Sequence, residues 1–198
     1  MRIGVLGGTF DPPHVGHLAL AEAAIDQLGL DEVIFMPAFR NPIKGRRVTT
    51  APKDRLGMVQ ALVAFADNPK LALSDLEITR GGPSYTVDSL TELQMVQPGE
   101  YWFLLGADSL KTLPDWKQPH RLVKLARLGA VLRPPAIENE IMARVPDDFK
   151  PFVDLIHMKP VDISSTDLRD RMARRQNVSI WLPNEVTQYI SKHRLYNE

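Results

Sequence analysis

The amino-terminal residues 2–28 read RIGVLGGTFDPPHVGHLALAEAAIDQL, in which three kinds of local sequence follow one another. Residues 2–6 form a short, mainly apolar run that is typical of a buried β-strand. Residues 7–15 are rich in glycine and proline and predict a loop. From about residue 16 to residue 28 the apolar side chains recur at helical spacing, and a glycine then ends the run. The stretch therefore predicts a strand, a tight loop and a helix, in that order.

The rest of the chain continues this alternation of strands and helices. We expect further strands at 33–36, 71–78, 102–105, 128–132 and 152–157. We expect further helices at 52–65, 85–96, 119–126, 165–174 and 183–193, and a short one after Asp108. The strands are continuous apolar runs, as in a parallel sheet that helices cover on both faces. The predicted fold class is a doubly wound α/β sheet in a single domain of residues 1–198.

Composition and charge exclude several classes of function. The 198 residues carry 24 Lys+Arg and 24 Asp+Glu, and a general nucleic-acid-binding protein usually has a basic excess instead. The chain has no cysteine, which excludes disulfides, thiolate nucleophiles and cysteine-based metal sites. No apolar run approaches the ~18 residues of a membrane span, and the N-terminus lacks the apolar region of a signal peptide. We therefore expect a soluble, cytoplasmic protein with no nucleic-acid or membrane partner.

The loop after the first strand lies where open α/β sheets bind ligands, at the carboxyl end of a strand. Gly7 and Gly8 allow a tight turn and bring backbone N–H groups close to an anion, although a purely structural turn is the alternative for a Gly-Gly pair. His14 and His17 are three residues apart across the start of a helix, so they can point to the same side. We interpret them as hydrogen-bond donors to a phosphate. A metal pair is the weaker interpretation, because catalytic metal sites usually take three protein ligands.

Two motifs carry a resemblance to a known superfamily. Residues 7–17, GGTFDPPHVGH, resemble the signature of the nucleotidylyltransferases, whose centre is His-x-Gly-His. Residues 164–169, SSTDLR, are similar to the second signature, Ser-x-x-x-x-Arg on a carboxy-terminal helix. From the residues alone, Ser164 or Ser165 suits a helix N-cap, and Arg169 one turn later can reach a phosphate near the helix start. The resemblance implies a Rossmann-like nucleotidylyltransferase fold. Class I aminoacyl-tRNA synthetases share a His-x-Gly-His-like motif, but no Lys-Met-Ser-Lys-Ser-type loop is visible here.

Within the superfamily, the chain resembles the bacterial nicotinate-nucleotide adenylyltransferases. The similar stretches are residues 82–90, GPSYTVDSL, residues 105–116, LGADSLKTLPDW, and the carboxy-terminal residues 189–196. The resemblance implies transfer of AMP from ATP to nicotinate mononucleotide, with Mg²⁺ accompanying the ATP. Both partners are then small molecules, and a homo-oligomer is left open. The chain departs from the family at Ile43, where a histidine is usual.

The resemblance also implies the residues of both substrate sites. The expected ATP-binding residues are Gly7, Gly8, Thr9, Phe10, His14, His17, Gly106, Asp108, Ser164, Ser165 and Arg169. The expected residues for nicotinate mononucleotide are Gly8, Lys44, Tyr85, Thr86 and Trp116. We expect four of these residues to act on the phosphates during catalysis: His17, His14, Arg169 and Lys44. No protein metal site is expected.

Several of these assignments also have a physical reason, and each has an alternative. Trp116 lies in a proline-rich loop and can stack on a pyridine ring, or it anchors that loop in the core. Tyr85 and Thr86 lie at a helix start whose N–H groups can hold a carboxylate, and capping by Ser84 is compatible with that role. Asp108 can cap the next helix or accept a hydrogen bond from a ribose hydroxyl.

Two rival functions remain at this stage. The first is a sister transferase that uses nicotinamide mononucleotide or phosphopantetheine as the acceptor. The second is a nucleotide sensor without chemistry, against which the paired motifs argue. From its length and charge, we conjecture that the loop of residues 40–50 closes over the substrates. The sequence gives no account of residues 136–150, for which a variable surface insert is one interpretation.

Overall fold

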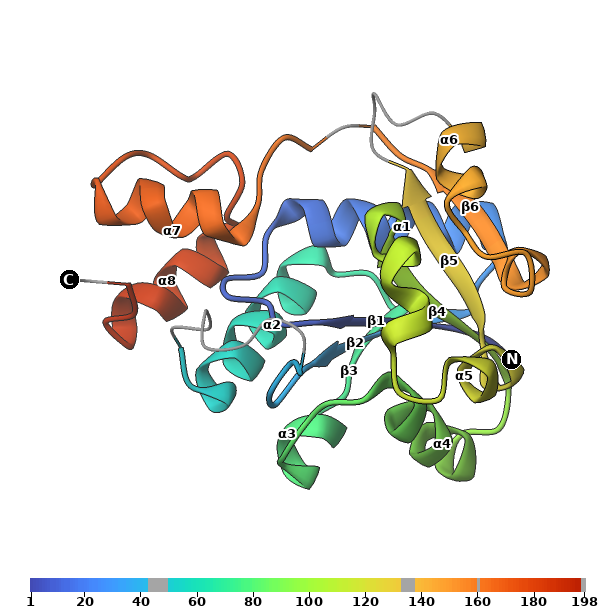
Figure 1. Cartoon of the computed structure of the whole chain (residues 1–198). Helices are drawn as coiled ribbons and strands as arrows, with labels where there is room; N and C mark the ends of the chain where they lie inside the picture. Colours follow the sequence, from blue (N-terminus) through green and yellow to red (C-terminus); the bar gives the residue numbers. More distant parts are fainter. Residues whose placement is uncertain (43–49, 133–137, 160, 197–198) are drawn as a thin grey trace. The chain divides into compact units, whose positions relative to one another are not determined.

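The computed structural model describes residues 1–42, 50–132, 138–159 and 161–196 (Figure 1). Its strands are β1 (Arg2–Gly8), β2 (Glu32–Pro37), β3 (Leu71–Leu73), β4 (Glu100–Gly106), β5 (Arg127–Leu132) and β6 (Val153–His157). Its α-helices are α1 (Val15–Leu28), α2 (Pro52–Ala66), α3 (Leu76–Arg80), α4 (Thr86–Val96), α5 (Pro119–Leu125), α6 (Glu138–Ala143), α7 (Ser165–Ala173) and α8 (Asn184–Lys192). Two 3₁₀ helices are η1 (Ala107–Asp115) and η2 (Lys150–Phe152). Among the described residues, no helix is both long and apolar enough to span a bilayer.

The strands form one six-stranded sheet in the order β3-β2-β1-β4-β5-β6. β1 pairs in parallel with β4, with Gly4 opposite Trp102, and β4 and β5 each continue the parallel pairing toward β6. The order reverses beside β1, which is the arrangement of a doubly wound sheet. The predicted fold class is therefore confirmed, and the glycine-rich loop follows the carboxyl end of β1.

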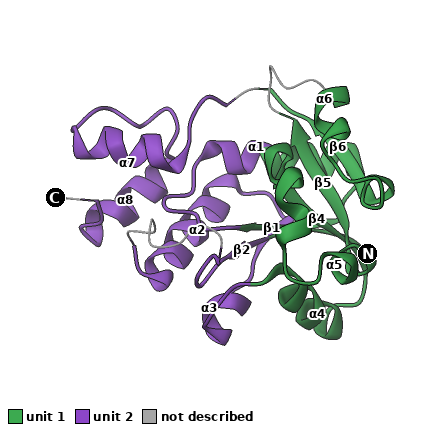
Figure 2. Ribbon diagram, in the orientation of Figure 1, with its two compact units in different colours: residues 1–7, 20–34, 85–160 green, residues 8–19, 35–84, 161–198 purple. Residues whose placement is uncertain are grey.

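The chain divides into two compact units, coloured separately in Figure 2. Unit 1 comprises Met1–Gly7, Leu20–Ile34 and Tyr85–Pro160, and unit 2 comprises Gly8–Ala19, Phe35–Ser84 and Val161–Glu198. Each unit combines three segments that are distant in sequence. The expectation of a single domain stays a prediction.

Within unit 1, both faces of the strands are covered by other parts of the chain. On one face, a Cβ added to Gly129 of β5 would lie 3.3 Å from Leu28 of α1, so the absence of a side chain allows the helix to pack closely. On the other face, the ring of Phe103 in β4 contacts Trp116, with the ring centroids 5.8 Å apart. The central residues of β4 are buried throughout, as expected for a strand between two layers.

Unit 2 is built around α2. The buried residues of this helix are Arg55, Met58, Val59 and Leu62, which share one face because they are spaced three and four apart. Helix α8 packs against α2 where Gly57 leaves room for Tyr189. A Cβ at Gly57 would lie only 2.3 Å from the Tyr189 hydroxyl, so a larger residue cannot occupy this position without displacing that ring.

The structure corrects one local prediction and two interpretations of the sequence. Residues 71–78 were expected to be extended throughout, but the strand ends at Leu73 and α3 begins at Leu76. The reason is turn chemistry, since the Ser74 hydroxyl accepts a hydrogen bond from the Leu76 N–H and competes with strand pairing. Ser84 does not cap α4: Tyr85 is the N-cap residue, and the Ser84 hydroxyl accepts the Phe39 N–H at 2.9 Å instead.

The third correction concerns the segment interpreted as a surface insert. In its described part, residues 138–150, the side chains of Ile141, Val145 and Phe149 are buried. These apolar side chains therefore belong to the core of unit 1. The sequence pattern did not show this because α6 is only six residues long, too short for a clear period.

Candidate active site

The chain turns at Phe10, just after β1, rather than at Gly7 and Gly8, which are the last residues of that strand. Phe10 has φ = 52°, in the left-handed region that side chains rarely adopt. Gly8 is required for a different reason: a Cβ there would lie 2.9 Å from the Phe10 ring. The expectation that the two glycines supply the tight turn is thus corrected to a role in close packing. Thr9 and Phe10 are both buried.

His14 and His17 lie together at the start of α1, as their spacing predicts. Their ring centroids are 4.0 Å apart, and His14 is buried whereas His17 is partly exposed. Nδ1 of His17 accepts the main-chain N–H of His14 at 3.1 Å, and Nδ1 of His14 accepts the N–H of Gly16 at 3.2 Å. In a neutral imidazole whose Nδ1 accepts, Nε2 carries the proton. The backbone therefore fixes both rings as Nε2–H donors.

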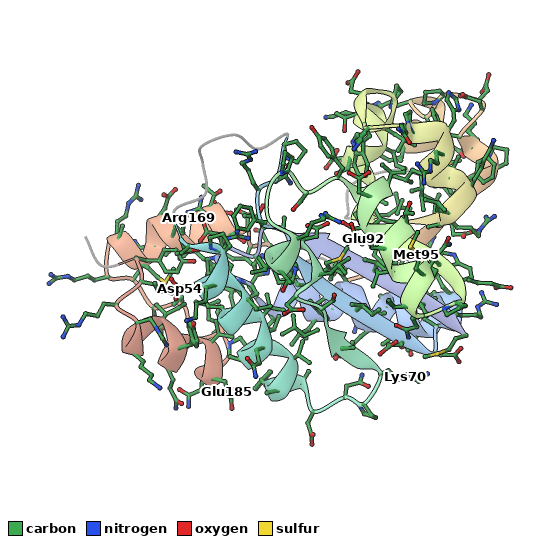
Figure 3. All side chains as sticks on the ribbon, turned by 90° about the horizontal axis from the view of Figure 1, so that it is seen from below. Asp54, Lys70, Glu92, Met95, Arg169 and Glu185 are labelled. Atoms are coloured by element: carbon green, nitrogen blue, oxygen red, sulfur yellow. The ribbon has the colours of Figure 1, made fainter. Side chains whose placement is uncertain are left out.

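Helix α7 brings the second motif to the same loop. Ser164 is its N-cap and forms a capping box with Asp167, which confirms one of the two predicted caps. The Ser165 hydroxyl donates to the carbonyl oxygen of Pro12 at 2.8 Å. Arg169, labelled in Figure 3, donates from Nη1 to the carbonyl oxygen of Asp11 at 2.6 Å. The two motifs, far apart in the sequence, thus meet within unit 2.

Asp11 is a buried carboxylate that links this loop to the carboxy-terminal segment. It accepts hydrogen bonds from the hydroxyls of Thr50 and Tyr196, the latter at 2.7 Å, and its Oδ2 lies 3.9 Å from Nη1 of Arg169. The pKa of the Tyr196 phenol is raised well above its usual range. Partial burial is the larger cause, and the hydrogen bond to Asp11 is the next. Asp11, Thr50 and Tyr196 were not assigned a role from the sequence. Asp11 and Tyr196 lie in stretches that resemble the family, so the sequence carried a signal for these two residues.

Arg55 was also missed. Its side chain is fully buried on α2, and its Nη atoms donate to the main-chain carbonyls of Thr9, Ala38 and Phe39 at 2.8, 2.6 and 2.9 Å. Burial lowers the pKa of the guanidinium, although the nearby charge of Asp11 partly opposes this shift. The sequence signal is an arginine at the first position of an apolar stripe on a helix.

The remaining predicted site residues belong to unit 1 or fall outside the described residues. Lys44 falls outside the described residues. Gly106, Asp108, Tyr85, Thr86 and Trp116 belong to unit 1. Asp108 is exposed, and Gly106, not Asp108, is the N-cap residue of η1. The role of these residues in substrate binding stays a prediction.

The two alternatives for Trp116 can be compared with its contacts. Its indole N–H donates to the Thr112 hydroxyl at 3.2 Å, and its ring packs edge-on against Phe103. The residue is half-buried. These contacts support the anchoring of the loop, and stacking of the ring on a ligand stays a prediction.

Comparison with known proteins agrees with this geometry. The cytidylyltransferase-like family matches residues 5–171. A protein of Thermomicrobium roseum named nicotinate-nucleotide adenylyltransferase is 42% identical, covering 98% of this chain and 91% of its own length. A protein of the same name from Dehalococcoides mccartyi is 39% identical, covering 99% and 97%. The chain belongs to the nicotinate-nucleotide adenylyltransferase family.

Solved structures confirm the fold of this family member. The nicotinic acid mononucleotide adenylyltransferase of Plasmodium falciparum, complexed with NaAD, superposes with a TM-score of 0.79 at 20% identity and covers 99% of this chain and 97% of its own. Like its relatives in the nicotinate-nucleotide adenylyltransferase family, the protein is a nucleotidyltransferase enzyme.

Proposed function

We propose that this protein transfers the AMP group of ATP to nicotinate mononucleotide, forming deamido-NAD and releasing pyrophosphate. The observation that carries the proposal is the hydrogen bond from Arg169 to the main chain of Asp11, because it joins the second nucleotidyltransferase motif to the loop that bears His14 and His17. Relatives over nearly their whole length carry the name of this activity. A more distant relative binds NaAD, the product expected here.

The reaction needs no covalent intermediate with the enzyme. A phosphate oxygen of nicotinate mononucleotide attacks the α-phosphorus of ATP, and a new P–O bond forms. The bond from the α-phosphorus to the oxygen that bridges it to the β-phosphorus breaks, and its electron pair leaves with pyrophosphate. Catalysis is then a matter of positioning and of stabilising the charge that develops on the phosphate oxygens.

The described residues divide this work in a simple way. The Nε2–H groups of His17 and His14 donate to phosphate oxygens, and His17 acts on the α-phosphate because it is the more exposed of the two. Arg169 uses two of its contacts on Asp11 and Thr166, and a guanidinium has five N–H donors, so others remain for the triphosphate. Mg²⁺ would enter with ATP as part of the substrate and would supply positive charge to its phosphates, so few protein ligands would be needed. Lys44 stays a prediction for the far side of the phosphates.

The acceptor is the point on which the proposal is tested. Pyrophosphate release is measured with ATP and Mg²⁺ and with equal concentrations of nicotinate mononucleotide, nicotinamide mononucleotide or phosphopantetheine. We expect the acid to be preferred over the amide by at least about 100-fold in kcat/KM, since a site built for a carboxylate rejects an analogue that leaves its donors unpaired. Equal use of acid and amide would keep the mechanism but remove the carboxylate site.

If the protein still binds ATP but releases no pyrophosphate with any of the three acceptors, the proposal is overturned in favour of a nucleotide sensor. The control is Arg169→Met, which removes the guanidinium but keeps most of the side-chain length. If this variant binds ATP as tightly as the unchanged protein, the assignment of the second motif to the triphosphate is wrong.

A further inference from the structure

We propose that Arg55 is a positioning residue that holds the backbone of the phosphate-binding loop in its active geometry. The inference rests on the proposed function, since it assigns that loop to the triphosphate. Arg55 itself is fully buried on α2 and faces the main chain of two loops. It therefore acts through the backbone rather than on the substrate.

The first step is the set of hydrogen bonds. Nη1 bridges the carbonyl oxygens of Thr9, in the loop after β1, and Ala38, in the loop after β2. Nη2 adds the carbonyl of Phe39. The Ala38 N–H also donates to the Gly8 carbonyl at 2.8 Å, so the two loops are joined directly as well. One guanidinium thus fixes three peptide planes.

The second step is the direction of those planes. In a trans peptide the N–H points opposite to the C=O. Because the Thr9 carbonyl points at Arg55, the N–H of Phe10 points away from it, and the left-handed φ of Phe10 is held by the same contact. Backbone in this region persists only where its surroundings determine it. Without Arg55 the peptide between Thr9 and Phe10 is free to turn, and its N–H no longer has a fixed direction.

The third step is the cost of this arrangement. All hydrogen bonds of Arg55 among the described residues go to neutral carbonyl oxygens, and Nε has no partner there. Burial of a charge costs free energy unless a counter-charge pairs with it. Stability alone is therefore a poor reason for an arginine at this position, whereas the fixing of two loops by a planar fork of donors is a good one.

Arg55→Lys gives the sharpest test. Lysine keeps the positive charge, but its compact ammonium cannot reproduce the fork that spans three carbonyls. We expect kcat for pyrophosphate release to fall roughly 10- to 100-fold, as for other small displacements of reacting groups, while KM for nicotinate mononucleotide changes less than about threefold. Both constants are measured well below the Tm of the variant, so that the folded fraction does not limit the rate.

The matched control is Leu62→Ala, two turns further along the same buried face. It creates a cavity in the core and lowers the Tm, but it removes none of the hydrogen bonds that Arg55 makes to the two loops. If kcat falls equally in the two variants, Arg55 is structural and the proposal is overturned. A wild-type kcat in Arg55→Lys overturns it as well.

A variant that does not fold is also informative. If Arg55→Lys does not fold, Arg55→Gln is measured instead, because it needs no buried charge and still offers two donors. Failure of both to fold would show a structural role and overturn positioning. Failure of the proposed function is distinct, since then the unchanged protein releases no pyrophosphate with any acceptor.

Discussion

At the scale of the residue, the proposed role of the two histidines depends on which ring nitrogen carries a proton. Both histidines accept backbone N–H groups at Nδ1 and are thereby fixed as Nε2–H donors. Their spacing is visible in the sequence, and so is Arg169. The tautomer is not visible, because it follows from the hydrogen bonds of the folded loop. Arg55 was missed for a related reason: an arginine in a helix usually extends its charge to water, so its position on an apolar stripe is a weak signal until packing shows that it is enclosed.

His17 carries the first prediction. His17→Ala should lower kcat by about 10²–10³-fold, the usual effect of removing one donor to a developing oxyanion, while the protein stays folded. His17→Asn serves as the control. The oxygen of the asparagine side chain can still accept the N–H of His14, but the side chain has no donor at the position of Nε2–H. We expect both variants to be similarly slow in a steady-state pyrophosphate assay and similarly folded by circular dichroism. A near-wild-type kcat in either variant would contradict the role of His17.

At the scale of the element, helix starts were predicted better than strand ends. The cap of α7 follows from local chemistry, since Ser164 and Asp167 lie three residues apart in the sequence. The end of β3 depends on the Ser74–Asp75 pair, whose turn competes with an otherwise apolar run. The contact of Tyr196 with Asp11 joins residues 185 positions apart and has no local signature.

The segment after α8 provides the second prediction. Tyr196→Phe removes a hydrogen bond to a buried carboxylate and should cost about 1–2 kcal/mol of unfolding free energy at pH 7. The pKa of Tyr196 is raised in the folded state, so its contribution is complete below the unfolded value of 10.0 and is lost as the pH rises above it. The stability of the unchanged protein should therefore fall more steeply above pH 10 than that of the variant.

Denaturant unfolding at several pH values provides the measurement. Tyr101→Phe is the matched control, because its hydroxyl bonds a neutral carbonyl, that of Gln97. It should cost less at pH 7, about 1 kcal/mol, and should leave kcat unchanged. If the unfolding free energy falls equally steeply above pH 10 in the unchanged protein and in Tyr196→Phe, then Tyr196 does not keep its proton in the folded state.

At the scale of the whole molecule, the sequence predicted the class of sheet because continuous apolar runs and intervening helices are local patterns. It did not predict that segments 8–19, 35–84 and 161–198 form one compact unit, because that grouping depends on contacts between distant residues. The hydrogen bonds of Asp11 and Arg55 are such contacts. They make the loop after β1 dependent on α2 and on the carboxy-terminal segment.

This dependence predicts how ATP should act on unit 2. At ATP concentrations about 100-fold above its Kd, binding should stabilise the protein by about 2.7 kcal/mol. Amide hydrogen exchange should slow in residues 8–10, 50–55 and 164–169 together, since one network joins them, and much less in the edge strand β6. In Arg169→Met, residues 164–169 should lose more of this protection than the other two segments, because the hydrogen bond from α7 to Asp11 is gone. Two outcomes would mean that the three segments do not respond as one unit. In the first, ATP slows exchange only in residues 8–10. In the second, the protection of residues 164–169 is unchanged in Arg169→Met.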